Sequence, residues 1–179
     1  QRYNIDIDSI IDFLNPTESK RFYKSAEDNA KIGSCSAIDI FCFTKNLYKN
    51  IPEFSVGRIG FDNWLVWKAR RTFTPVIDMT SSTIIFHQNH SYKFRDFNNH
   101  SNTLQSDEAK MNYKLMGTNA LNINDANWFL DDGKVKKKRD DEFKQRNLWK
   151  ISIIFPEFSF FLTWYKRIYR RITNMISLK

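Results

Sequence analysis

Residues 56–92 constrain the fold of this chain more than any other stretch. They contain two of the five glycines and two of the three histidines. The stretch begins V-G-R-I-G-F-D-N-W-L, and glycines on both sides of Arg58 allow the backbone to approach a ligand or another strand closely. From Asp62 or Asn63 through residue 71 the sequence favours a helix. Residues 75–78 and 84–87 follow as short apolar strands separated by a Ser/Thr turn.

The residues before this stretch add a strand, a helix and another strand. Residues 2–8 alternate between apolar and polar side chains, as a half-buried or edge strand does. Thr17 is the predicted N-cap of a helix that runs to about residue 31. Residues 37–43 (A-I-D-I-F-C-F) predict a buried strand that carries Asp39. The order of elements predicts an α/β fold.

Asp39 is the one acidic side chain of the predicted strand at 37–43. Burial of an unpaired carboxylate is costly, so Asp39 must either have a partner or line a cleft. Hydrogen bonds to backbone amides are the alternative that gives it no functional role.

Length and composition predict one domain that is rich in aromatic side chains. The chain has 179 residues, 41% of them hydrophobic, with sixteen Phe, seven Tyr and five Trp. Cys35 and Cys42 are too widely spaced for a C-x-x-C pair and are expected to be free thiols. Because it starts at Gln1 with no leader-like segment, we expect the chain to be either processed or the downstream piece of something longer.

The net charge of +8 is concentrated at one end of the chain. Residues 1–133 contain 15 Lys and Arg against 16 Asp and Glu, whereas residues 134–179 contain 13 against 4. A nucleic-acid-binding surface spread over the folded body is therefore unexpected, and nucleic acid is not a predicted partner.

The C-terminal region is predicted to form a hairpin and a basic tail. Residues 126–135 suggest a hairpin around Asp132 and Gly133, and the charge block at 136–142 is expected to end the folded body. From residue 158 onward rings and aliphatic side chains recur at helical spacing opposite basic residues. The apolar run is shorter than the roughly 20 residues that span a bilayer. Such a helix either lies in a membrane interface or packs its rings on the domain.

Three motifs in the chain together resemble a known family. The series G-R-I-G-F-D-N-W-L, P-V-I-D and H-Q-N-H-S-Y is similar to the C-terminal half of nucleotide-sugar glycosyltransferase-like proteins with the GT-A fold. The resemblance covers roughly residues 2–135. It implies a partial GT-A-like mixed sheet flanked by helices, with residues 1–135 as the acceptor-side portion and residues 136–179 as a basic amphipathic helical tail.

The resemblance also implies roles for particular residues. Asp62 matches the carboxylate that acts as general base on an acceptor hydroxyl, and His87 or His90 matches the histidine that joins the metal at the diphosphate. The implied cofactor is a divalent cation, Mn²⁺ or Mg²⁺. The Asp-x-Asp motif that holds this cation belongs upstream of the matched region. Residues 6–8 match only its letters and lie in a predicted strand.

Each candidate residue also has a structural interpretation. Asp62 is alternatively the N-cap of the helix that follows it. His87 or His90 is alternatively a hydrogen-bonded core residue, because positions three apart on a strand face opposite sides. Among the predicted substrate-binding residues Asp39, Arg58, Asn63 and Trp64, Arg58 is alternatively a solvated loop charge. Trp64, like Trp67, is alternatively part of the core.

Together these features predict the C-terminal part of a glycosyltransferase. It would transfer a sugar from a nucleotide-sugar donor to an acceptor hydroxyl, and would be incomplete without a donor-binding half. One alternative is a non-catalytic module that binds carbohydrate or a partner. Another is a peripheral membrane protein that acts through its basic tail on an anionic membrane surface. The expected location is cytoplasmic, with membrane association where the tail binds lipid.

Overall fold

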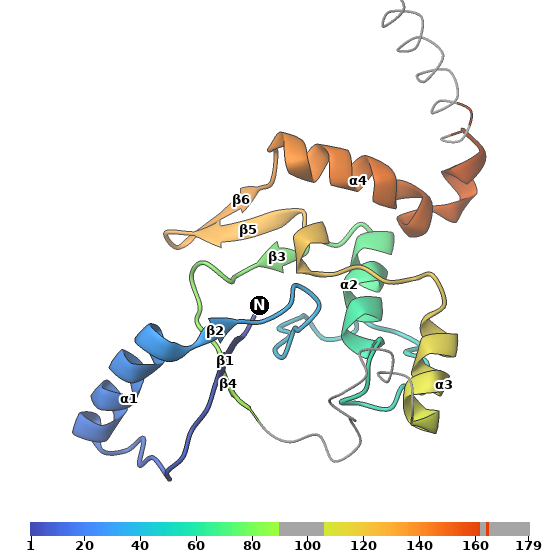
Figure 1. Cartoon of the computed structure of the whole chain (residues 1–179). Coiled ribbons are helices and arrows are strands. Elements are labelled where there is room, and N and C mark those ends of the chain that lie inside the picture. Colours follow the sequence, from blue (N-terminus) through green and yellow to red (C-terminus); the bar gives the residue numbers. More distant parts are fainter. Residues whose placement is uncertain (90–105, 162–163, 165–179) are drawn as a thin grey trace, which may run out of the picture.

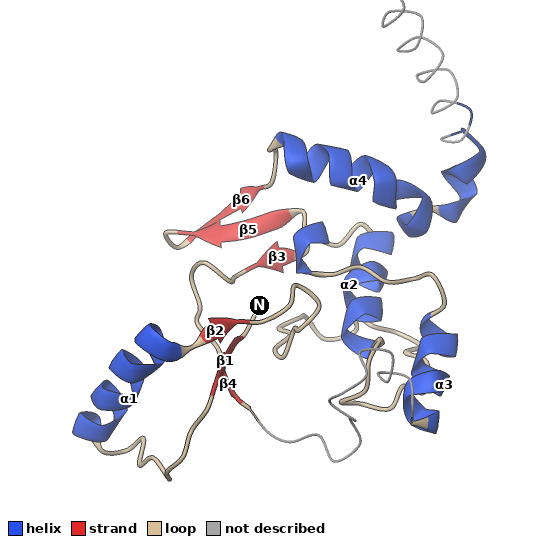
Figure 2. Ribbon diagram, viewed as in Figure 1, coloured by secondary structure: helices blue, strands red, loops and turns tan. Residues whose placement is uncertain are grey.

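The computed structural model describes residues 1–89, 106–161 and 164. It has a mixed α/β fold in which two small three-stranded sheets are accompanied by helices (Figures 1 and 2). The strands are β1 (Tyr3–Ile5), β2 (Lys31–Ile32), β3 (Ile77–Asp78), β4 (Phe86–Gln88), β5 (Trp128–Asp131) and β6 (Lys134–Lys137). The helices are α1 (Pro16–Asn29), α2 (Phe61–Arg71), α3 (Asp107–Met116) and α4 (Asp141–Ile154), with 3₁₀ turns η2 (Ile123–Asp125) and η3 (Pro156–Phe158).

The strands form two separate sheets. The first has the order β2-β1-β4, with β1 antiparallel to β2 and parallel to β4, so that Asn4 is opposite His87. The second has the order β3-β5-β6, with β3 parallel to β5 and the β5–β6 hairpin antiparallel. Figure 2 shows the two sheets as distinct groups of strands. The predicted mixed pairing is present, but it is divided between two sheets.

Helix α1 begins two residues earlier than predicted, because its cap is Asn15 and not Thr17. The Asn15 side chain accepts hydrogen bonds from the backbone amides of Thr17 and Glu18, and Pro16 occupies the first helical position. Thr17 is therefore inside the helix. The helix projects from the first sheet, on the opposite side of the molecule from α2 and α3 (Figure 1). Its Phe22 ring contacts Phe86 of β4 edge-on, with centroids 5.6 Å apart.

The predicted strand at residues 37–43 is extended chain that belongs to neither sheet. Ile38 and Phe41 from this segment pack against the core. Strand propensity is local, whereas a strand also needs a neighbouring edge at hydrogen-bonding distance. We call residues 37–43 the extended segment.

The core lies around α2. Trp64, Leu65 and Met116 form one buried cluster, and Val66, Leu121 and Ile154 form a second. Because Met116 comes from α3 and Ile154 from α4, α2 is the element that both of these helices cover.

The charge block at 136–142 does not end the folded body, contrary to the prediction. Residues 136 and 137 belong to β6, and Asp140 caps α4 by accepting from the amide of Phe143. Ile154 of α4 is only 1% exposed, and the Trp67 indole donates to the carbonyl oxygen of Ile153 at 2.9 Å. The predicted boundary at residue 135 therefore falls inside the β5–β6 hairpin, and α4 belongs to the core.

Candidate functional site

Asp39 is the centre of a charged cluster that joins three distant parts of the chain. One carboxylate oxygen, Oδ1, accepts from Arg2 Nη1 at 2.8 Å. The other, Oδ2, lies 2.9 Å from His87 Nδ1. The side chains of Arg2, Asp39 and His87 are 20%, 27% and 23% exposed, so solvent and ligands can reach all three. Asp39 therefore has the partners that its position in an apolar segment required.

The sheet β2-β1-β4 brings Arg2 and His87 together. Arg2 directly precedes β1, and His87 is the central residue of the adjacent parallel strand β4. Gly33 lies against Arg2 on the other side, and its amide donates to the Arg2 carbonyl at 2.8 Å. A Cβ atom on Gly33 would come within 3.2 Å of the Arg2 side chain, so glycine permits this close packing.

The two contacts of the His87 ring differ in length. Nδ1 is 2.9 Å from the carboxylate of Asp39 and 3.4 Å from Arg2 Nη1. The shorter contact assigns the Nδ1 proton to a hydrogen bond with the carboxylate, which fixes the orientation of the ring. Asp39 therefore orients two cationic or potentially cationic side chains at once.

Asp62 lies beside this cluster, at the second position of α2. Burial raises the pKa of the Asp62 carboxyl, and backbone amides of Asn63 and Asp62 itself act against that shift. The charge of Asp39 raises this pKa further, and the amide of Ile38 lowers it. The net direction is upward. Asp62 is therefore a neighbour of Asp39 and a stronger base than an exposed aspartate.

Asp62 is not the N-cap of α2. The helix begins at Phe61, its cap residue is Gly60 with φ of +102°, and no side chain caps it. The alternative interpretation of Asp62 as an N-cap is therefore wrong. Its carboxyl instead lies next to the first-turn amides, where the helix dipole favours negative charge.

Two predicted substrate-binding residues next to Asp62 serve the fold. The Asn63 side chain donates to the carbonyl oxygen of Leu121 at 2.9 Å, and the Leu121 amide donates back to the Asn63 carbonyl at 3.2 Å. Trp64 is 5% exposed and packs beside Phe54 and Trp67, so its ring offers almost no surface on which a sugar could stack. Trp64 fits the core interpretation.

Two predicted site residues remain, Arg58 and His90. Arg58 lies close enough to α3 for its charge to act on Glu108. His90, the second predicted metal ligand, lies outside the described residues. Within residues 1–89, 106–161 and 164, no three His, Cys, Asp or Glu side chains come together as a metal site. The described residues alone therefore do not fit a complete cation site.

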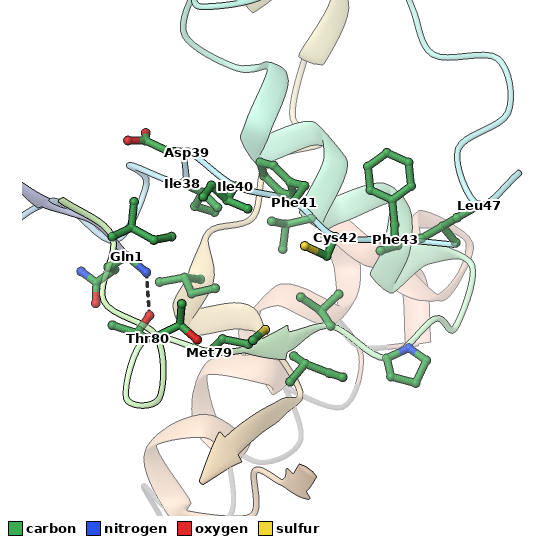
Figure 3. Close-up of a pocket in the computed structure, with 18 of the residues that line it drawn as sticks. Gln1, Ile38, Asp39, Ile40, Phe41, Cys42, Phe43, Leu47, Met79 and Thr80 are labelled. Atoms are coloured by element: carbon green, nitrogen blue, oxygen red, sulfur yellow. Dashed lines mark hydrogen bonds between the residues drawn. The ribbon is translucent and has the colours of Figure 1, made fainter. Parts of the chain in front are cut away.

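A cavity of about 410 Å³ lies on the side of the extended segment that faces away from the Asp39 carboxylate (Figure 3). Its walls are mainly apolar, and the N-terminal amine of Gln1 donates to Thr80 Oγ1 at 2.6 Å at its edge. Asp39 is one of the lining residues, but Figure 3 shows its carboxylate directed away from Met79 and Thr80. Asp62 and His87 do not line this cavity. The charged cluster and the cavity are thus on opposite sides of one segment.

Arg2 is the member of the cluster that sequence reasoning missed. It lies 37 positions from Asp39 and 85 from His87, and nothing in the alternating pattern of residues 2–8 distinguishes it. The available signal was indirect, namely that Asp39 in an apolar segment needed a partner.

Comparison of the chain with protein-family models, with curated proteins and with solved structures found no match.

Proposed function

We propose that this chain is the acceptor-side part of a glycosyltransferase of the GT-A type, which transfers a sugar from a nucleotide-sugar donor to an acceptor hydroxyl. The observation that carries the proposal is the position of Asp62, a carboxyl of raised pKa next to the Arg2–Asp39–His87 cluster. The resemblance of the G-R-I-G-F-D-N-W-L and H-Q-N-H-S-Y series to that family supports it independently. A donor-binding half would complete the site.

Asp62 is the proposed general base. As the acceptor oxygen attacks the anomeric carbon, its proton passes to the Asp62 carboxylate and the bond between that carbon and the diphosphate oxygen breaks. A carboxylate with a raised pKa takes up the proton more readily than an ordinary one. In this scheme the base regains its starting form by releasing the proton to solvent.

Arg2 and His87 are the proposed counter-charges for the diphosphate that leaves. A guanidinium can bind two phosphate oxygens at once, and a histidine can add a second donor. Asp39 is a positioning residue in this scheme because it holds both side chains by hydrogen bonds. A divalent cation would supply further charge stabilisation of the diphosphate, and it would need ligands beyond those of the described residues.

The test compares two Asp→Asn variants of the full-length protein. Asp62→Asn removes the base, and Asp107→Asn makes the same change in the first turn of α3, where the side chain is 97% exposed. The assay measures release of nucleoside diphosphate from UDP-glucose, UDP-galactose and GDP-mannose with a mixture of glycan acceptors. We expect Asp62→Asn to lower kcat by about 100-fold or more, the typical contribution of a general base, with Asp107→Asn unchanged.

Two results would contradict the proposal. Equal turnover by wild type and Asp62→Asn, with both folded by circular dichroism, would remove Asp62 from the chemistry. Absence of donor turnover combined with calorimetric binding of free glycans would instead identify a non-catalytic carbohydrate-binding module.

A further inference from the structure

The cavity beside the extended segment lies between two parts of the chain that do not pair with each other. Figure 3 shows side chains of the extended segment along one wall, and Met79 and Thr80, which follow β3, on the opposite wall. Val66 and Ala69 of α2 also line the cavity, and they are only 2% and 3% exposed. The cavity therefore reaches the buried core.

The mouth of the cavity is apolar. Ile40 and Phe43 on the extended segment, Ile77 in β3 and Met79 all line the cavity, and each is between 41% and 57% exposed. Burial of apolar surface is favourable by about 25 cal/mol per Å². A ligand that entered the cavity would cover these four side chains from both walls and remove their surface from water.

The volume of the cavity limits the size of such a ligand. Ligand pockets usually have volumes of roughly 300–1,000 Å³, and the 410 Å³ found here lies within that range. A benzene molecule binds in an apolar cavity of about 150 Å³, so by proportion this cavity holds roughly sixteen non-hydrogen atoms. A short chain or a small ring system fits.

Polar side chains of the lining are already hydrogen-bonded within the protein. The Tyr48 hydroxyl donates to the carbonyl oxygen of Leu65 at 3.2 Å. Thr80 Oγ1 donates to the carboxylate of Asp78 at 2.6 Å and accepts from the amine of Gln1 at the same distance. These groups therefore have little capacity left to bind a strongly polar ligand.

The lining also lacks a side-chain cation. None of the described residues that line the cavity is Lys, Arg or His. The one acidic side chain of the lining, Asp39, directs its carboxylate away from Met79 and Thr80 (Figure 3). Thr83 adds a further hydroxyl to the lining, and a hydroxyl can both donate and accept. The lining therefore favours an uncharged ligand over an anionic one, because a buried charge without a partner is costly.

We propose that the cavity binds an uncharged molecule with an aliphatic chain, of the chemical class of a long-chain alcohol. The chain lies between the extended segment and β3, and the hydroxyl remains near the mouth. Asp62 and His87 do not line the cavity. The inference is therefore independent of the proposed base and goes beyond the transfer reaction.

The experiment titrates 1-decanol into the full chain by isothermal titration calorimetry at neutral pH, with sodium decanoate as the charged probe of equal chain length. The test variant is Ile40→Ser/Met79→Ser, which makes the mouth polar at two exposed positions. The control variant, Ile10→Ser/Leu14→Ser, makes matched changes at side chains that are 100% and 92% exposed and do not line the cavity. Thermal melting confirms that each variant is folded.

Two free cysteines locate the bound molecule without any substitution. Cys42 lines the cavity and Cys35 does not. Alkylation by N-ethylmaleimide, read by peptide mass spectrometry, measures both thiols in the wild type. With 1-decanol at about ten times its Kd, alkylation of Cys42 should slow at least about threefold, with Cys35 unchanged as the internal control. Equal effects on both thiols would overturn the proposal even if the test variant failed to fold.

We expect saturable binding of 1-decanol to the wild type and to the control variant. The test variant should bind at least about tenfold more weakly, because it loses apolar contacts on both walls. Decanoate should also bind at least about tenfold more weakly than the alcohol, because its carboxylate finds no side-chain cation on the lining. No saturable binding of 1-decanol, or equal affinity of test variant and wild type, would overturn the proposal. Decanoate binding as tightly as the alcohol, or more tightly, would assign the cavity to another class of ligand and would also overturn it.

Discussion

Asp62 and Asp78 are two partly buried aspartates whose surroundings shift the pKa in opposite directions. The pKa of Asp62 is raised because burial and the nearby charge of Asp39 outweigh the favourable backbone amides. Burial also acts to raise the pKa of Asp78, but hydrogen bonds from Thr80 and the charge of Lys138 lower it overall. Lys138 Nζ is 3.2 Å from the Asp78 carboxylate, and the two side chains are 18% and 19% exposed.

This contrast predicts opposite pH dependences of stability for two substitutions. The ordinary pKa of both carboxyls is 3.8. The pKa of Asp62 in the folded protein lies above that value. Ionisation of Asp62 therefore destabilises the fold as the pH rises from 3.8 through this raised pKa. Asp62→Asn should therefore gain in stability relative to wild type as the pH rises from 3.8 through the raised pKa of Asp62 in the folded protein.

Asp78→Asn should show the reverse trend. The lowered pKa of Asp78 means that its stabilisation is present above pH 3.8 and is lost as the pH falls through the folded pKa. This variant should be less stable than wild type at neutral pH, with the difference shrinking in acid. Urea unfolding at a series of pH values measures both variants. If the stability difference from wild type changed with pH in the same direction for both variants, the two carboxyls would not have oppositely shifted pKa values.

At the scale of an element, the start of α2 depends on glycine. Gly60 caps the helix in a left-handed conformation with φ of +102°, and it is buried against α3. A Cβ atom there would lie 3.3 Å from Met116 Sδ. Gly57 in the same loop also has a positive φ, +78°, but nothing lies within 4 Å of the position of its Cβ. A substitution at Gly57 therefore tests backbone strain alone, whereas a substitution at Gly60 tests backbone strain together with crowding against Met116.

Alanine at these two positions should have different costs. Gly57→Ala should destabilise the protein by about 1 kcal/mol, the cost of a left-handed conformation for a residue with a side chain. Gly60→Ala should lose the same amount and a further ~1 kcal/mol from contact with Met116. Urea midpoints of the two variants measure this difference. Equal midpoints would mean that Met116 moves aside without cost.

At the scale of the whole molecule, helix α4 covers the core of the described body. Ile154 is 1% exposed and packs with Val66 and Leu121, which come from two other parts of the chain. Asp125 in η2, only 3% exposed, binds Arg146 of α4 at 2.6 Å. Removal of α4 would therefore expose an apolar surface and leave Asp125 without this partner.

Substitutions on two faces of α4 test whether it is part of the fold. Ile154→Ala should destabilise the protein by about 2–5 kcal/mol, the usual cost of a cavity at a fully buried position. Leu148→Ala on the same helix, at a site 49% exposed, should cost less than about 1 kcal/mol. Urea unfolding compares them. If both variants had the stability of wild type, α4 would not be packed on the body in solution.

Several elements followed from the sequence alone because their causes are local. A helix after residue 15 was predicted, and although its cap is Asn15 and not Thr17, the cap acts on amides only two and three residues away. The Asp132-Gly133 pair adopts the positive φ values of 48° and 68° that a tight hairpin turn requires. The concentration of basic charge after residue 133 is likewise a property of the sequence itself.

The tertiary structure decided the features that depend on distant residues. Residues 37–43 have strand propensity, but they pair with no strand of either sheet. Asp39 needed a partner, yet only folding brings Arg2 and His87 to it across 37 and 48 positions. The charge block after β6 had the composition of a boundary, and α4 packs on the core because its buried face finds an apolar surface on α2. Local sequence sets propensity, whereas contacts between distant segments determine which groups meet.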